Sequence, residues 1–130
     1  MKRQNSITVE WTLAPNARRP AERAKPEVLG RLPRITRLMA LAIKFEQMIR
    51  DGIVRDYADL ARLGLVTPAR LTQIMNLTNL APDLQQEILF LDRVTEGKDP
   101  IAERSIRSVV RHAEWDRQRE SWRRLRNAAR

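Results

Sequence analysis

The sequence predicts an all-α domain of five or six helices, preceded by an N-terminal arm that resembles a strand. Two observations lead to this prediction. Between residues 34 and 51 the apolar side chains recur at intervals of three and four, which is the spacing of one helix face. Beyond that segment, prolines, glycines and capping residues divide the chain into shorter stretches of helical pattern. With 130 residues, the chain fits one domain with basic extensions.

The arm is expected at residues 1–33, where two patterns follow each other. Four apolar side chains alternate with polar ones, as in a half-buried strand at about residues 6–13: Ile7, Val9, Trp11 and Leu13. Residues 14–33 then hold four of the seven prolines, a composition typical of an extended linker. Because a lone strand leaves its backbone groups unpaired, a second copy of the chain is the simplest partner. A disordered arm is the alternative.

The first three helices are predicted from their capping residues. The longest covers residues 34–51, and Gly52 stands where a C-terminal cap is expected. Asp56 is placed to cap a short second helix. After a turn, Thr67 caps a third helix, and Pro68 occupies its first position, where a missing N–H costs nothing.

The remaining helices are predicted at residues 82–91, 101–110 and 114–128, with a break at Gly97 and Pro100 between the first two. The chain therefore divides into the arm, a core at residues 34–100, and basic C-terminal helices at residues 101–130.

The charge of the chain favours a polyanionic partner. It holds 25 Lys and Arg against 16 Asp and Glu, a net charge of +9. Residues 1–37 carry a net charge of +6, residues 38–102 carry −2, and residues 103–130 carry +5. Basic segments on both sides of a compact domain can follow the phosphate backbone of a nucleic acid.

Other classes of protein are disfavoured. The chain has no cysteine, which excludes thiolate metal sites, and its single histidine, His112, has no cysteine or second histidine nearby with which to form a convincing metal site or catalytic triad. No apolar run approaches the roughly 18 residues of a membrane span, and the N-terminus does not resemble a signal peptide. We expect no enzymatic activity, no cofactor, no metal and no membrane association, and a cytoplasmic, nucleoid-associated location in a bacterium.

Residues 57–80 have the pattern of a helix-turn-helix. Four residues mark the helix crossing, the turn and the two core anchors of the second helix: Ala61, Val66, Leu71 and Ile74. This spacing suits two helices that cross at about 90–120°. In the commonest arrangement glycine directly precedes the apolar turn residue, whereas here Leu65 occupies that place and Gly64 comes one residue earlier.

The outer face of the second helix carries side chains suited to a major groove. Arg can bond guanine, Gln and Asn can bond adenine, and Ala and Thr methyl groups can touch the thymine methyl. The predicted base contacts are Thr67, Ala69, Arg70, Thr72, Gln73 and Asn76. The predicted contacts to the DNA backbone are Arg55, Arg62, Arg104, Arg107, Arg123 and Arg124. The alternative is a solvated polar face whose arginines only solubilise the helices.

This region resembles the helix-turn-helix of the ParB and KorB family of partition proteins. The likeness covers residues 55–90 and runs through ADLA at 58–61, the helix opening at 67–73 and the leucine-rich stretch 74–80, which precedes a proline and a supporting helix. The resemblance implies that residues 67–76 bind double-stranded DNA. The nucleotide-binding region of that family has no counterpart in these 130 residues, so nucleotide hydrolysis and chromosome segregation are not implied.

These observations predict a sequence-specific protein that binds double-stranded DNA as a homodimer, with half-site centres about 34 Å apart. A transcriptional regulator or a site-marking protein of a phage, plasmid or integrated element fits this description. The chain also resembles small proteins that accompany recombinases in bacterial mobile elements. Two alternatives are a sequence-indifferent nucleoprotein or RNA-binding module, and an adaptor for a recombinase that uses the Trp115, Trp122 and Leu125 face.

Overall fold

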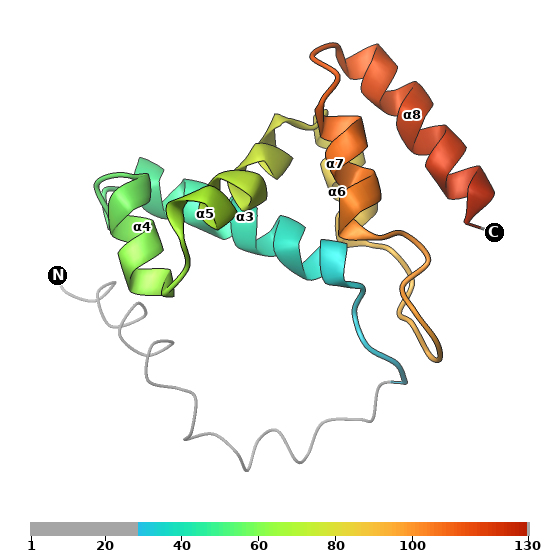
Figure 1. Cartoon of the computed structure of the whole chain (residues 1–130), viewed down its shortest axis with the longest axis horizontal. Helices are drawn as coiled ribbons and strands as arrows, with labels where there is room; N and C mark the ends of the chain where they lie inside the picture. The colour runs from blue at the N-terminus through green and yellow to red at the C-terminus, as the bar shows by residue number, and fades with distance from the viewer. Residues whose placement is uncertain (1–28, 130) are drawn as a thin grey trace, which may run out of the picture.

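The computed structural model describes residues 29–129, and the strand predicted at about residues 6–13 lies outside this range. The described residues form six α-helices and one short 3-10 helix, with no regular strand, so the all-α prediction is confirmed (Figure 1). The elements are α3 (Arg34–Arg50), α4 (Tyr57–Gly64), α5 (Pro68–Met75), η1 (Asn76–Asn79), α6 (Pro82–Leu89), α7 (Glu103–Val110) and α8 (Trp115–Ala128).

Helix α3 is the element against which most others pack. It contacts α5, η1, α6 and α7, and it buries Ile35, Met39 and Ala42 on one face. The helix ends as predicted, because Gly52 adopts a φ of 77° and donates its N–H to the Ile49 carbonyl at 3.1 Å. Within residues 29–129, every helix is too short or too polar to span a membrane.

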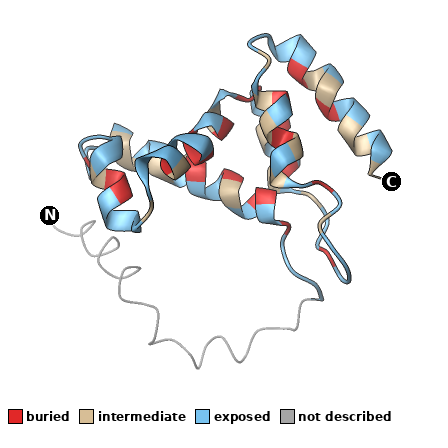
Figure 2. Ribbon diagram, viewed as in Figure 1, coloured by how far each residue is buried: buried red, intermediate tan, exposed pale blue. Residues whose placement is uncertain are grey.

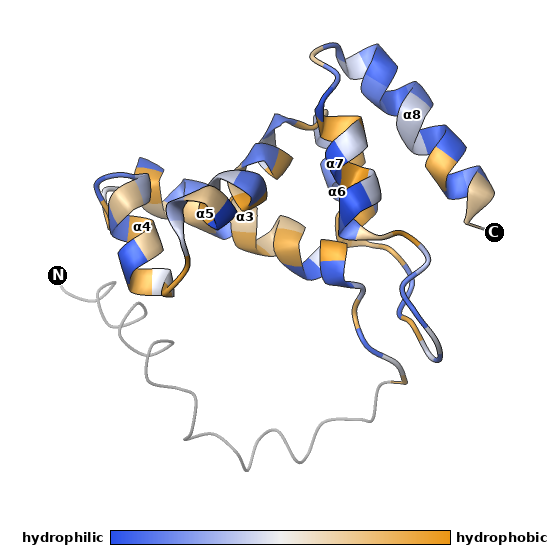
Figure 3. Cartoon of the chain, in the orientation of Figure 1, coloured by the Kyte–Doolittle hydropathy of each residue, from blue (hydrophilic) through white to orange (hydrophobic). Residues whose placement is uncertain are grey.

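The C-terminal helices share the core of the preceding ones. Ile106 and Val109 of α7 and Trp122 of α8 are buried in the same hydrophobic cluster as the buried face of α3 (Figure 2). Figure 3 shows the rest of α8 as mainly hydrophilic, in keeping with its many arginines. Trp115 remains 48% exposed, so it does not join Trp122 in the core.

The buried side chain of Gln118 connects two loops to α8. Its Oε1 accepts the N–H of Ala81 at 2.8 Å, and its Nε2 donates to the carbonyls of Asn79 and His112 at 3.2 and 2.9 Å. Only 1% of the Gln118 surface is exposed, and both ends of its buried amide are satisfied by backbone groups. The polar pattern of α8 gives no sign of this role.

The end of the predicted linker is attached to the loop between α6 and α7. Arg31 and Val94 exchange backbone hydrogen bonds of 3.0 and 2.8 Å, and the Arg31 side chain forms an ion pair with Asp99. Gly30 allows the close approach, because a Cβ there would lie 2.8 Å from the Val94 carbonyl oxygen.

The turn between α4 and α5 places a leucine in a conformation that favours glycine. Leu65 has φ 57° and ψ 40°, and its side chain is 91% exposed. Gly64, by contrast, is the last helical residue, where a Cβ would meet only Val66 Cγ2 at 3.9 Å. The displaced glycine seen in the sequence therefore leaves strain at Leu65.

Replacing either of these two residues should stabilise the chain. Leu65→Gly removes the left-handed penalty, Gly64→Ala favours the helix, and each should raise the free energy of unfolding by about 0.5–1 kcal/mol. Chemical denaturation of the single and double variants measures this. Leu65→Ala, which removes exposed apolar surface but keeps the strain, is the control and should give no comparable gain. A Leu65→Gly chain less stable than the parent would contradict the turn geometry.

Candidate nucleic-acid interface

Helices α4 and α5 begin at the caps that the sequence predicts. Asp56 accepts the N–H of Asp59 at 3.0 Å, and Thr67 Oγ1 accepts the N–H of Arg70 at 3.1 Å. Pro68 is the first residue of α5. The two helices contact each other and are separated by only three residues, 65–67.

Helix α5 has one buried and one exposed face. Leu71, Ile74 and Met75 are 0–4% exposed and belong to the core, which confirms the two predicted anchors. Of the predicted base contacts, five are exposed: Thr67, Ala69, Thr72, Gln73 and Asn76. Arg70 is the exception, since it lies half-buried at the edge of this face.

Arg70 is held by a carboxylate from another helix. Its Nη1 lies 2.5 Å from Glu103 Oε2 and its Nη2 lies 3.1 Å from Glu103 Oε1, a two-pronged pair between α5 and the first residue of α7. The same Nη1 donates to Gln73 Oε1 at 2.9 Å. The prediction that Arg70 contacts a base stays a prediction, and in this structure its guanidinium is engaged with Glu103 and Gln73.

Glu103 forms ion pairs with three arginines from three helices. Besides Arg70, its carboxylate lies 3.3 Å from Arg34 Nε and 3.1 Å from Arg107 Nη1. The hydrogen bonds from Arg70 hold the pKa of Glu103 below its ordinary value, and Arg34 and Arg107 act in the same direction. Three guanidinium groups against one carboxylate leave an excess of positive charge beside the exposed face of α5.

A groove of about 300 Å³ separates α5 and η1 from α7. Gln73 and Asn76 line it on one side, and Arg107 and Arg111 line it on the other. Arg104, Arg107 and Arg111 follow each other at helical spacing, and Arg104 and Arg111 are exposed. The structure thus brings two predicted backbone contacts, Arg104 and Arg107, to the helix beside α5. Arg111, the third arginine at this spacing, is the C-terminal cap residue of the same helix.

Arg55 directly precedes the cap of α4, Arg62 lies in its last turn, and both arginines share Asp59 as partner. Arg55 Nε lies 3.1 Å from Asp59 Oδ2, and Arg62 pairs with the other oxygen. The hydrogen bond from Arg55 lowers the pKa of Asp59. The arginine side chains nevertheless remain 82% and 67% exposed, so both can meet a polyanion.

Arg123 and Arg124 lie apart from the other predicted contacts. They are exposed on α8, at the opposite end of the molecule from α4 (Figure 1). Helix α8 is fixed to α6 by Arg119 with Asp83 at 3.1 Å and by Trp122 Nε1 with Glu87 at 3.2 Å. The predicted backbone contacts therefore form two separate groups, one around α4, α5 and α7 and one on α8.

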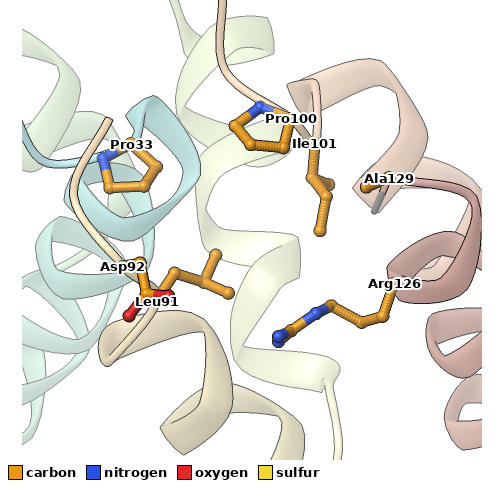
Figure 4. A pocket seen from close by; sticks show the side chains of 7 residues that line it. All are labelled: Pro33, Leu91, Asp92, Pro100, Ile101, Arg126 and Ala129. Atoms are coloured by element: carbon orange, nitrogen blue, oxygen red, sulfur yellow. The ribbon is translucent and has the colours of Figure 1, made fainter. Parts of the chain in front are cut away.

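A pocket of about 170 Å³ lies near the C-terminal end of α8 and does not adjoin these surfaces. Figure 4 shows the Arg126 guanidinium reaching into it toward Leu91. Asp92 also lines the pocket, so the two charged side chains present opposite signs to any ligand. Within residues 29–129 no group of three His, Cys, Asp or Glu side chains could hold a metal ion.

Comparison with protein-family models, with curated proteins and with solved structures found no match to this chain.

The cluster around Glu103 should make stability depend on pH. Because the pKa of Glu103 is lower in the folded chain than in the unfolded one, its pairs stabilise the fold above the ordinary glutamate value of about 4.3. That contribution is lost as the pH falls through the lower folded value. We expect Glu103→Gln to lower the melting temperature at about pH 7 and to lower it much less at about pH 2.

Thermal unfolding of both chains at the two pH values measures this difference. Glu114→Gln is the control, because Glu114 is 75% exposed and, among residues 29–129, forms an ion pair only with Arg117, three residues further along, at 3.2 Å. A loss for Glu103→Gln that stays the same at both pH values would contradict the electrostatic role of Glu103.

Proposed function

We propose that the protein binds double-stranded DNA in a sequence-specific manner, with α4 and α5 acting as a helix-turn-helix and α5 lying in the major groove. The observation that supports this best is the division of α5 into a fully buried face and an exposed face of hydrogen-bonding side chains. An α-helix fits the major groove, which is about 12 Å wide.

The exposed residues of α5 match the chemistry of base edges. Asn76 can donate and accept, Gln73 can donate through its Nε2, and Ala69 and Thr72 offer methyl groups to thymine. Thr72 Oγ1 donates to the Pro68 carbonyl at 3.0 Å, which orients its hydroxyl inward along the helix. The face is therefore mixed in character, as base recognition requires, rather than uniformly charged.

Exposed arginines stand on both sides of this face. Arg55 directly precedes the cap of α4 and Arg62 lies in its last turn, while Arg104 lies on α7 and Arg111 directly follows it; Arg107, which is half-buried, lies between these two. Positions on either side of a helix in the groove suit the two phosphate strands. Neutralised phosphates release counterions, so this part of the affinity should fall with salt.

The biological role within this proposal is transcriptional regulation or the marking of a site on a phage, plasmid or integrated element. An eight-residue helix such as α5 reaches few base pairs, so pairing two copies on two half-sites is the usual way to gain contacts. The homodimer is therefore part of the proposal.

A sequence-indifferent nucleoprotein is the second candidate, and the arginines of α8 favour it. Arg117, Arg123 and Arg124 are exposed at a distance from α5, so they could bind phosphates without any base contact.

Fluorescence anisotropy with DNA from upstream of the protein's own gene and with scrambled DNA, over a salt series, separates the candidates. The proposal expects a preference of about a thousandfold or more at physiological salt. Asn76→Ala should weaken binding to the preferred site by about 1–3 kcal/mol. The control variant Arg123→Ala/Arg124→Ala should weaken both duplexes alike and flatten the salt slope by up to about two units.

Equal and steeply salt-dependent binding to every duplex would favour the nucleoprotein. No binding at all would contradict both candidates and would favour an adaptor.

A further inference from the structure

The side chain of Arg70 connects the exposed face of α5 to a residue outside the α4–α5 unit. It donates to Gln73 Oε1 at 2.9 Å and to both oxygens of Glu103. Because an arginine can only donate, the atom of Gln73 that faces Arg70 must be the carbonyl oxygen. The Nε2 amino group of Gln73 is then turned away from Arg70. Glu103, Arg70 and Gln73 form a relay that fixes the orientation of the Gln73 amide.

This relay leaves mainly hydrogen-bond donors for an incoming base. Gln73 presents its amino group, and the bonds to Gln73 and Glu103 use three of the five N–H groups of Arg70. In the major groove guanine offers two acceptors, N7 and O6, whereas adenine offers the N7 acceptor beside its N6 donor. An unrestrained glutamine matches adenine, because its amino group donates to N7 and its oxygen accepts from N6. When the oxygen is turned toward Arg70, the glutamine places its amino group against the adenine N6 group, and two donors then face each other.

We infer that Glu103, acting through Arg70, makes Gln73 select guanine over adenine at one position of the DNA target. The inference rests on the DNA binding proposed above. Glu103 touches no base in this account, so it is a positioning residue that determines specificity.

Two further contacts keep Glu103 in place. Arg34 of α3 and Arg107 of α7 lie 3.3 and 3.1 Å from its oxygens, and only 16% of its side chain is exposed. Glu103 therefore offers Arg70 a fixed acceptor held from two other sides, rather than a flexible surface carboxylate. The amide of Gln73 is oriented before DNA arrives, which suits selective recognition.

The test compares base preferences of the full chain and its variants. Selection from a random duplex pool gives the preferred site, and anisotropy then compares all four base pairs at each position. For the parent chain we expect one position at which guanine exceeds adenine by at least about fivefold. Arg70→Ala releases the Gln73 oxygen, so this ratio should fall below about two or invert. Glu103→Gln, which leaves Arg70 a neutral acceptor, should lower the ratio in the same direction.

Two control variants separate this effect from charge and folding. Arg104→Ala removes an exposed charge one residue from Glu103. It should lower the affinity for the duplexes with each of the four base pairs by the same factor. Arg70→Lys keeps a donor between Glu103 and Gln73, and it should retain the guanine preference. Circular dichroism checks that each variant is folded. If Arg70→Ala does not fold, the base preference of Glu103→Gln tests the inference in its place.

The possible failures are distinct. If Arg70→Ala lowers the affinity for all four duplexes by the same factor and keeps the parental ratio of guanine to adenine affinity, the inference is overturned. Arg70 would then be a contact to the DNA backbone. The inference is also overturned if the parent chain selects a site but shows no guanine preference at any position whose base preference changes in Gln73→Ala. The DNA-binding proposal would remain intact in that case. A pool in which the parent chain enriches no sequence would overturn the proposed function together with the inference.

Discussion

The burial of one face of α3 is the constraint on which the rest of the structure depends. Ile35, Met39 and Ala42 are 0–1% exposed, and α5, η1, α6 and α7 all pack against their helix. Full burial of a side chain such as Ile or Met stabilises a fold by roughly 1.5–3 kcal/mol, so this face is a large share of a small domain's stability. Because α5 packs its apolar residues against α3, its polar residues remain on the surface. The exposed face of α5, which we propose binds DNA, is thus a consequence of core packing.

Around this apolar centre, single polar side chains fix the relative positions of the shorter helices. Glu103 joins α3, α5 and α7 through arginines, and Gln118 joins α8 to the loops before α6 and α8. Glu103 acts at the edge of the exposed face, where it also limits what Arg70 can contact. Gln118 acts in the interior, where it supplies backbone groups with partners. Glu103 therefore both completes the fold and shapes the surface beside α5, whereas Gln118 serves the fold alone.

Local signals in the sequence were sufficient for the helices and their caps. Asp56, Thr67 and Pro68 act on groups within three residues, so their roles can be predicted without a tertiary structure. The contact between Arg70 and Glu103 spans 33 residues, and that between Ala81 and Gln118 spans 37. Such contacts depend on how helices pack, which periodicity does not specify. For this reason the sequence placed Arg70 with freely exposed residues, whereas the structure ties it to α7. The predicted strand lies outside the described residues, so it stays a prediction.

We propose that α5, with α7 beside it, is the surface that contacts DNA. Amide chemical-shift mapping of the full chain, titrated with a selected duplex, tests it most directly. We expect the largest shifts at Thr67, Thr72, Gln73 and Asn76, with smaller ones along α7. Shifts confined to α8 around Arg123 and Arg124, with α5 unchanged, would contradict it.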